Sequence, residues 1–457
     1  MFRFGAGGKY MKNRVYETLM ICIIIFLLTI SVAKIGLTDS SKQIKVSFVR
    51  CYDYDIIVPD DFPTIQLAVE SAASGNRIYV RSGVYNENIV INKAIFLIGE
   101  DKNSTVISGD GSDDVVSIVR NKVTFSGFTV ENGGDEGVQI QSNQCTISDN
   151  IITLNMDNGL SVTSCFENEI VNNHIILNND DGLSVSGGFG NTFKNNNISN
   201  NYDNGIVLDD TSSNTFLNNH IESNRDDGID LDNSNENYFI GNTVKDSQNK
   251  GIYMRKSSSE NQIYFNNFID NNPNAYDEFS NTWHNSKSQE GNYWAEYSGK
   301  DNNNDGIGDV PYLIDGGTNS DMYPLMNIWV NSKPDKPYRP IGEISGEVGV
   351  YYNYTSLTND PDDDQILYKW DWGDGNFSEW IGPFESGDLC LISNNWSKEG
   401  NFEIRVKAKD IFNQESEWSD PLPISMPKDK KEQHFNQGFL KNYRILFQGS
   451  HLLWRLF

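Results

Sequence analysis

A glycine that returns every 22 or 23 residues constrains the fold of this chain more than any other feature of its sequence. Each glycine precedes an apolar, a variable and an apolar residue, which is the two-residue alternation of a short β-strand. Such a repeat has no room for a helix, and the Leu and Asn pattern of leucine-rich repeats is absent. It therefore predicts the stacked coils of a right-handed parallel β-helix. The repeating glycines are Gly137, Gly159, Gly182, Gly205, Gly228 and Gly251.

Asparagine is the second periodic residue. The chain has 57 asparagines, and 33 of them fall between residues 150 and 300, where the glycine repeat is clearest. Most repeats end in one of them, which predicts a column of amide side chains that hydrogen bond from coil to coil. We also expect Gly and Asn to occupy turns that need a positive φ. The expected column is Asn173, Asn196, Asn219, Asn242 and Asn267.

A helix is expected to cap the N-terminal end of this β-helix, because an open end would expose its core and its strand edges. Thr64 is the predicted N-cap, and Gly75 is the predicted C-terminal stop. Strands are expected at residues 77–80, 83–92 and 94–99, and the β-helix as a whole should have roughly nine or ten coils. The buried stripe of the helix is Ile65, Ala68, Val69 and Ala72.

A second all-β domain is expected at residues 331–427. A Pro-rich linker begins at Lys333, and alternating strand patterns follow at residues 350–357, 366–372 and 402–410. Short strands separated by Gly, Pro and Asp turns predict an Ig-like β-sandwich. The fold class is therefore all-β, with a parallel β-helix and a capping helix at residues 50–330 followed by the sandwich.

The two ends of the chain differ from the middle in charge and hydropathy. Residues 1–36 contain an apolar run after several basic residues, which predicts a signal peptide or an N-terminal membrane anchor and an extracellular or cell-surface location. Residues 428–457 form a basic, aromatic tail that could also contact a membrane. The formal net charge of the whole chain is -27, which argues against a nucleic-acid partner.

Three segments resemble known families. Residues 56–100 resemble the N-terminal cap of the pectin-lyase-like β-helix superfamily, and the later coils with residues 291–312 resemble its NosD-like branch, which is common in archaeal surface proteins. WDWGDG at residues 370–375 and the strand at 400–410 resemble the PKD family of Ig-like domains. The superfamily includes lyases, hydrolases, epimerases and non-catalytic binding proteins, so the resemblance implies the fold and leaves the activity open.

An acidic patch on the outside of the β-helix supplies the catalytic candidates. Strand parity turns Ile229 and Leu231 inward, so the aspartates beside them face outward. Paired carboxylates serve polysaccharide hydrolases, and a basic residue with Ca²⁺ serves the lyases of this superfamily. The candidates are Asp203, Asp226, Asp230, Asp232 and Arg255.

Calcium is the expected cofactor, in a structural role. Residues 301–309 place oxygen ligands at alternating positions of a tight loop, with Gly at the sixth position, as in calcium-binding loops. A second set, Asp360, Asp362 and Asp364, lies in the sandwich domain. The predicted ligands of the first loop are Asp301, Asn303, Asp305, Ile307 and Asp309. Candidate glycosylation sites are Asn103, Asn197, Asn353, Asn376 and Asn395.

Three hypotheses for the function remain open. The first is an exported surface protein that binds a polysaccharide or another cell-envelope polymer without catalysis. The second is a Ca²⁺-dependent polysaccharide lyase, hydrolase or epimerase that uses the acidic outer face. The third is a copper-delivery accessory of the NosD type, although His174 and His220 lie two coils apart, about 9.6 Å, too far to share one ion.

Overall fold

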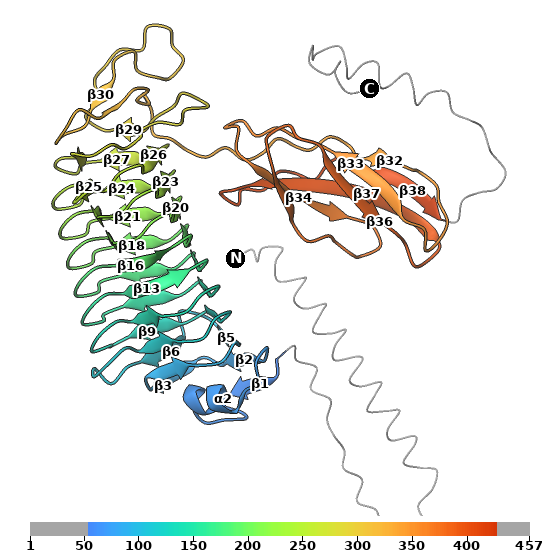
Figure 1. The fold of residues 1–457 in the computed structure, drawn as a ribbon. Coiled ribbons are helices and arrows are strands. Elements are labelled where there is room, and N and C mark those ends of the chain that lie inside the picture. Colours follow the sequence, from blue (N-terminus) through green and yellow to red (C-terminus); the bar gives the residue numbers. More distant parts are fainter. Residues whose placement is uncertain (1–53, 427–457) are drawn as a thin grey trace, which may run out of the picture. The chain divides into compact units, whose positions relative to one another are not determined.

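The structure is a computed structural model that describes residues 54–426. The predicted signal or anchor at residues 1–36 and the basic tail at residues 428–457 lie outside the described residues. Within them, residues 56–294 form a parallel β-helix and residues 341–426 form antiparallel sheets (Figure 1). No helix among residues 54–426 is long and apolar enough to cross a membrane.

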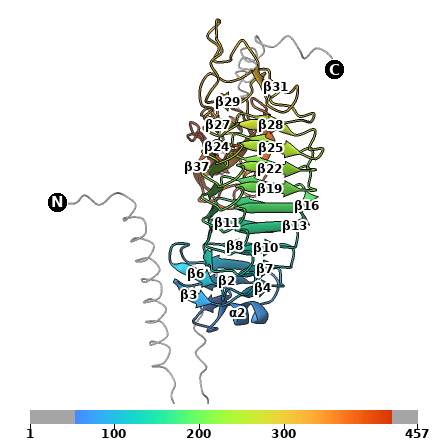
Figure 2. The same cartoon turned by 90° about the vertical axis from the view of Figure 1, so that its left-hand side faces the viewer.

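Three parallel sheets of ten, nine and ten strands make up the β-helix, in agreement with the expected number of coils. Successive strands of each sheet come from successive coils, as Figure 2 shows for β7 to β28. Sheet A consists of β1 (Ile56–Val58), β2 (Arg77–Val80), β5 (Phe96–Gly99), β8 (Thr124–Ser126), β11 (Thr146–Ser148), β14 (Glu169–Val171), β17 (Thr192–Lys194), β20 (Thr215–Leu217), β23 (Tyr238–Ile240) and β26 (Gln262–Tyr264).

Sheets B and C complete each coil. Sheet B consists of β3 (Gly83–Asn86), β6 (Thr105–Ser108), β9 (Thr129–Glu131), β12 (Ile151–Thr153), β15 (His174–Ile176), β18 (Asn197–Ser199), β21 (His220–Glu222), β24 (Thr243–Lys245), β27 (Asn267–Ile269) and β29 (Tyr293–Trp294). Sheet C consists of β4 (Ile89–Ile91), β7 (Val116–Ile118), β10 (Val138–Ile140), β13 (Leu160–Phe166), β16 (Leu183–Phe189), β19 (Ile206–Asp209), β22 (Ile229–Asp232), β25 (Ile252–Arg255) and β28 (Ala275–Asp277).

Each repeating glycine directly precedes a strand of sheet C. The predicted reason for glycine at these positions, a positive φ, was wrong. None of the six has a positive φ. A Cβ on Gly182 would lie 2.5 Å from Ile198 Cγ2, 2.6 Å from Asn201 Nδ2 and 2.8 Å from Gly205 O, so only glycine fits between stacked coils. The positive φ occurs instead at the residue before most of the asparagines in the columns, for example Asn172 before Asn173.

Three columns of buried asparagines run along the β-helix, one at each turn. In the predicted column, Asn196 Oδ1 accepts the backbone N–H and the Nδ2 group of Asn173 at 3.0 and 3.1 Å. Asn196 Nδ2 in turn donates to Asn219 Oδ1 at 3.0 Å and to Ile170 O at 2.8 Å. The columns are Asn150, Asn173, Asn196, Asn219, Asn242, Asn266 and Asn292; Asn155, Asn178, Asn201 and Asn224; and Asn168, Asn191, Asn214, Asn237, Asn261 and Asn281.

The last residue predicted for the first column was wrong by one position. Asn266 occupies the column and Asn267 begins β27, because the preceding coil has one additional residue, so that Asn242 and Asn266 are 24 apart. Inside the coils, Phe193, Phe216 and Phe239 stack with ring centroids 4.7 and 4.9 Å apart. These aromatic rings and the Ile, Leu and Val residues of the sheets fill one continuous core.

The capping helix is present as α2 (Ile65–Ser71). Thr64 Oγ1 accepts the Leu67 N–H at 3.3 Å, and Ile65, Ala68 and Val69 are buried against the first coil, as predicted. The helix ends at Ser71, before the predicted Gly75. Ala72 is already extended, and Asn76 Oδ1 takes the Ala73 N–H at 2.8 Å.

The second domain has two antiparallel sheets, which fit the predicted Ig-like fold. One contains β32 (Ile341–Gly342), β33 (Tyr352–Ser356) and β36 (Cys390–Asn394), and the other contains β35 (Ile381–Phe384), β34 (Ile366–Asp371), β37 (Gly400–Asp410) and β38 (Leu422–Met426). Trp370, Trp372 and Trp396 are buried in the core between them. Ile404, Val406 and Ala408 face this core, as the alternation predicts.

Candidate functional site: an acidic column along the β-helix

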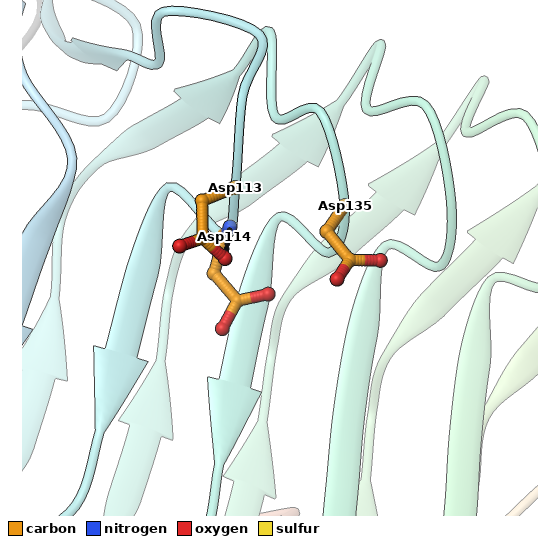
Figure 3. Close-up of side chains that lie close together, drawn as sticks. All are labelled: Asp113, Asp114 and Asp135. Carbon is orange, nitrogen blue, oxygen red and sulfur yellow. Dashed lines mark hydrogen bonds between the residues drawn. The ribbon is translucent and has the colours of Figure 1, made fainter.

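The turns between sheets B and C carry acidic residues in successive coils. Asp113 and Asp114 lie on one turn and Asp135 on the next, with their side chains on the same edge of the β-helix (Figure 3). One carboxylate oxygen of each residue lies within 4.8 Å of the other two. The triplets Asp135, Glu136 and Asp157, and Asp180, Asp181 and Asp203, show the same closeness. The acidic column consists of these residues together with Asp226 and Asp227, on the turn of the following coil.

Burial and contact between carboxyl groups raise several pKa values in the acidic column. Burial is the largest cause for Glu136, and a hydrogen bond with Asp114 adds to it, so the pKa of Glu136 rises to about 8. Burial and a hydrogen bond with Asp157 raise the pKa of Asp180 to about 7. At neutral pH the column therefore favours protons or cations that offset repulsion between its carboxylates.

Basic and aromatic side chains meet the column at its C-terminal end. Asp227 Oδ1 accepts the Lys250 N–H at 2.7 Å, and the Lys250 ammonium lies 3.7 Å from the same oxygen. That ammonium also lies 4.0 Å from the ring centroid of Tyr253. In the coil before Lys250, the Arg225 guanidinium lies 3.6 Å from the ring centroid of Tyr202, which is 47% exposed.

The structure brings together three of the predicted catalytic residues. Arg255 donates to Asp230 from Nε to Oδ1 at 3.0 Å and from Nη2 to Oδ2 at 2.6 Å, and Lys256 Nζ donates to Asp232 Oδ2 at 2.6 Å. The side chains of Asp230 and Asp232 are only 7% and 10% exposed. They point away from the core, as the alternation predicts, but basic side chains cover them. The other two candidates, Asp203 and Asp226, belong to the acidic column.

Most of the acidic column was missed in the sequence, although its signal was present. An Asp or Asn pair precedes nearly every repeating glycine, for example Asp157-Asn158 and Asp180-Asp181. Such pairs are also typical of turns, and of their members only Asp203 and Asp226 were named as candidate residues. The stacking of equivalent turns one coil apart is what converts them into a continuous line of carboxylates.

The outer face of sheet C beside the column carries serine and glutamine in its earlier coils and more varied side chains in its later coils. Its first outward position is Ser117, Gln139, Ser161 and Ser184 in four successive coils, aligned by the strand register. The next coils place Val207, Asp230 and Tyr253 at the same position. This face offers hydroxyl and amide groups in a straight line parallel to the acidic column.

The loop at residues 301–309 does not gather its carboxylates. Asp301 Oδ2 accepts the Gly306 N–H at 3.0 Å, and Asp305 Oδ1 accepts the Ile307 N–H at 2.9 Å. Asp309 Oδ2 accepts the Asn302 N–H at 2.8 Å. Within residues 54–426 these three aspartates do not form a close carboxylate triplet. Calcium bound by Asp301, Asn303, Asp305, Ile307 and Asp309 therefore stays a prediction.

Asp360, Asp362 and Asp364 do form such a triplet, with oxygens within 4.8 Å of one another. Of the candidate glycosylation sites, Asn103, Asn353 and Asn376 are exposed, whereas Asn197 and Asn395 are half-buried. Their modification stays a prediction as well.

Comparison with known families decides the family of the chain. The family model described as "Periplasmic copper-binding protein (NosD)" matches residues 69–299, just over half of the 457 residues. The chain belongs to the NosD family. This NosD-family chain is 35% identical over 85 residues to "Probable ABC transporter binding protein NosD" of Stutzerimonas stutzeri. That match covers 18% of the chain and 19% of the relative, so it spans about a fifth of the relative's length.

Among solved structures, the NosD-family chain is similar to the PKD domain of an M14-like peptidase from Thermoplasmatales archaeon SCGC AB-540-F20. The identity is 45%, with 22% of this chain and 100% of that domain covered and a TM-score of 0.21. It is also similar to pectate lyase Pel9A (16% identity, 52% of this chain and 76% of that chain, TM-score 0.39). A third is the Azotobacter vinelandii mannuronan C-5 epimerase AlgE6 A-module (14% identity, 48% and 90%, TM-score 0.32). No chemistry is carried over from these two enzymes.

The family description makes copper the metal to test against the residues present. Copper sites use imidazole and sulfur ligands. No group of three or more His, Cys, Asp or Glu ligands in the described part of the NosD-family chain includes a His or a Cys. Cys145 and Cys165 are buried, and burial raises the pKa of the Cys165 thiol to about 11. His220 Nε2 hydrogen bonds to Glu222 at 2.8 Å. The donor set at residues 54–426 therefore does not fit copper.

Proposed function

We propose that this NosD-family protein is exported and binds a linear polymer, a polysaccharide or another polymer of the cell envelope, along the side of its β-helix without catalysis. The observation that carries this proposal is the recurrence of the same chemistry in register from coil to coil. The acidic column and the hydroxyl face of sheet C repeat with the coil rise of about 4.8 Å. A repeating surface suits a repeating ligand, whereas catalysis needs one unique centre.

The groups on this surface suit a hydroxylated polymer. Carboxylates accept hydrogen bonds from hydroxyl groups, and the half-buried side chains of Ser117 and Ser184 can both accept and donate them. Tyr202, which is 47% exposed, adds an aromatic face on which a sugar ring can stack. Divalent cations in the column would also let it hold acidic polymers, which its charge otherwise repels.

The second domain supports the same proposal with an aromatic and basic face. Lys407 Nζ lies 5.5 Å from the ring centroid of Trp380 and 5.2 Å from that of Trp418, and Lys409 Nζ lies 4.7 Å from that of Trp380. Lys369 lies directly opposite Lys407 on the neighbouring strand. Glu415 pairs with Lys407, and the neighbouring Lys369 and Lys409 favour a role in binding an acidic group.

The test is retention of the full chain on a panel of neutral and acidic polysaccharides, with Ca²⁺ and with a chelator. The triple variant Asp157→Asn, Asp180→Asn, Asp203→Asn should lose at least tenfold in apparent affinity. The matched control is Asp149→Asn, Asp246→Asn, Asp270→Asn, which removes the same charge from exposed turn residues outside the column. An equal loss of affinity in both variants would mean that net charge alone controls binding, and it would contradict the proposal. New reducing ends or unsaturated products would contradict its non-catalytic part.

A second candidate function, a polysaccharide lyase, hydrolase or epimerase, is favoured by one local arrangement. Asp227, Asp230, Lys250, Tyr253 and Arg255 gather acids, bases and a phenol at the C-terminal end of the column. Burial raises the pKa of Asp227 to about 6, which suits an acid or base near neutral pH. Turnover that disappears in Asp227→Asn and persists in Asp149→Asn would support the enzyme. Copper delivery, the third hypothesis, finds no support in the donor set described above.

A further inference from the structure

The loop between β33 and β34 in the second domain holds a group of three carboxylates, two of which are buried. Asp360 is 5% exposed and Asp364 is 9% exposed. Together with Asp362, they place carboxylate oxygens within 4.8 Å of one another. Burial of like charges at this distance is strongly unfavourable unless a cation or hydrogen-bond donors compensate it.

Hydrogen bonds compensate only part of this charge. Asp360 Oδ1 accepts the N–H groups of Asp362 at 2.9 Å and of Asp364 at 3.4 Å. The other oxygen of Asp360, Oδ2, is buried and has no hydrogen-bond partner, and the same is true of Asp364 Oδ2. The exposed loop at residues 301–309 differs, since backbone N–H groups occupy its carboxylates.

The backbone of the loop explains why alternate aspartates converge. Asp363 has a φ of 60°, and the N–H of Asp363 bonds to the carbonyl of Asp360 at 3.1 Å. This tight turn brings residues 360, 362 and 364 together, while the Asp363 side chain faces solvent and pairs with Lys287 at 2.8 Å. The two unpartnered buried oxygens thus belong to a preformed loop.

We propose that this loop binds one Ca²⁺ ion through the carboxylates of Asp360, Asp362 and Asp364, with water completing the coordination. The three ligands are hard oxygens, and no nitrogen or sulfur donor joins the group, which favours Ca²⁺ or Mg²⁺ over transition metals. A loop that supplies several carboxylates suits Ca²⁺, whose coordination geometry is adaptable, because Mg²⁺ requires near-ideal octahedral geometry and retains most of its water.

The ion would join three segments of the domain. Asp362 accepts the N–H of Ser332, at the start of the domain, and the Asp360 N–H donates to Ser386 Oγ at 2.9 Å. The expected role of Ca²⁺ is therefore to stabilise the domain where the chain enters it. This site is separate from the polymer surface proposed for the β-helix.

The experiment uses the full chain after a chelator has removed bound metal. Calorimetric titration with Ca²⁺ or Mg²⁺ measures binding, and thermal unfolding with and without each ion measures stability. Ca²⁺ should bind and raise the unfolding temperature of the second domain, and Mg²⁺ should bind at least tenfold more weakly. Asp364→Asn should lower Ca²⁺ affinity at least tenfold. In chelator, however, that variant should unfold at a higher temperature than the wild type, because it relieves the repulsion.

Matched variants separate this site from others. Glu399→Gln removes an exposed carboxylate of the same domain and should change neither result. Asp305→Asn tests whether Ca²⁺ binds at residues 301–309 instead. If Asp364→Asn does not fold, Asp362→Asn takes its place. Polymer retention should persist in Asp364→Asn if both proposals hold. A wild type whose second domain neither binds nor is stabilised by Ca²⁺, or an Asp364→Asn variant with unchanged affinity, would overturn the proposal.

Discussion

Arg255 holds Asp230 in a two-point ion pair, with Nε 3.0 Å from Oδ1 and Nη2 2.6 Å from Oδ2. The pair lies on the outer face of sheet C and joins the adjacent strands β22 and β25. Because both oxygens of Asp230 are engaged and its side chain is 7% exposed, its geometry is that of a structural residue. This is the main reason for preferring binding over catalysis.

Removal of Arg255 should therefore destabilise the β-helix. Arg255→Met leaves Asp230 covered and unpaired, and we expect a loss of about 2–3 kcal/mol in the free energy of unfolding. Adding Asp230→Asn to Arg255→Met should restore part of the lost free energy of unfolding. Lys256→Met is the control, since Lys256 is 70% exposed and its ion pair should contribute less than about 1 kcal/mol. Urea unfolding measures each value, and equal effects of the two single variants would contradict the assignment.

The asparagine columns predict a large difference between two asparagines of the same β-helix. Asn196→Ala removes the acceptor of two Asn173 donors and the donor to Ile170 O. Each buried group left without a partner costs about 1–3 kcal/mol, so the melting temperature should fall by several degrees or the protein should not fold. Asn179→Ala, at an exposed position, should change it by about one degree at most. Scanning calorimetry distinguishes the two outcomes.

The stacking glycines should reject even one added methyl group. In Gly182→Ala the new Cβ would lie 2.8 Å or less from three atoms of the next coil, so we expect at least about 3 kcal/mol of destabilisation or insoluble protein. In Gly83→Ala the closest atom would be 3.5 Å away, and the variant should fold normally. Comparable soluble yield and melting temperature for both variants would show that the coils can separate.

The acidic column predicts that stability falls as pH rises. The folded pKa values of about 8 for Glu136 and about 7 for Asp180 exceed the usual values of about 4.3 and 3.9. Between these limits the folded state binds more protons than the unfolded state, so its stabilisation is complete below about pH 4 and is lost as pH rises through 7 and 8. Asp181 and Asp227, each with a pKa raised to about 6, act in the same direction.

Without divalent cations, the melting temperature should therefore decrease between pH 5 and pH 8. Glu136→Gln combined with Asp180→Asn should flatten this dependence, whereas Asp149→Asn, outside the column, should leave it unchanged. A melting temperature that rises over this range would mean that other groups dominate.

The sequence was sufficient to predict the coils, the capping helix and three strands of the second domain, because each depends on local periodicity. The inward residues Ile206 and Leu208 and the N-cap Thr64 follow from spacing alone. The reason for Gly182 did not follow, because its neighbours Ile198 and Gly205 both belong to the next coil, and only the stacking of coils shows the contact.

The candidate site was less predictable, because it depends on side chains that meet between coils. Alternation correctly turns Asp230 away from the core, but it does not reveal that Arg255 covers it from the adjacent strand. The closeness of Asp135 and Asp157 likewise requires the register of the turns. In the second domain, the DxDxD spacing indicated Asp360 and Asp364, while their unpartnered oxygens are visible only in the structure.

The asparagine columns also limit how a gene for such a protein can change in length. A coil removed or duplicated as one block of 23 residues leaves each neighbour facing the same amides and the same glycine. A lone inserted residue would shift every later side chain, unless a turn absorbs it. The 24-residue interval from Asn237 to Asn261 contains such a turn, where Lys256 and Ser257 both adopt positive φ. We therefore expect insertions and deletions in this part of the chain to add or remove whole coils. Insertions or deletions of a single residue should occur only in the turns.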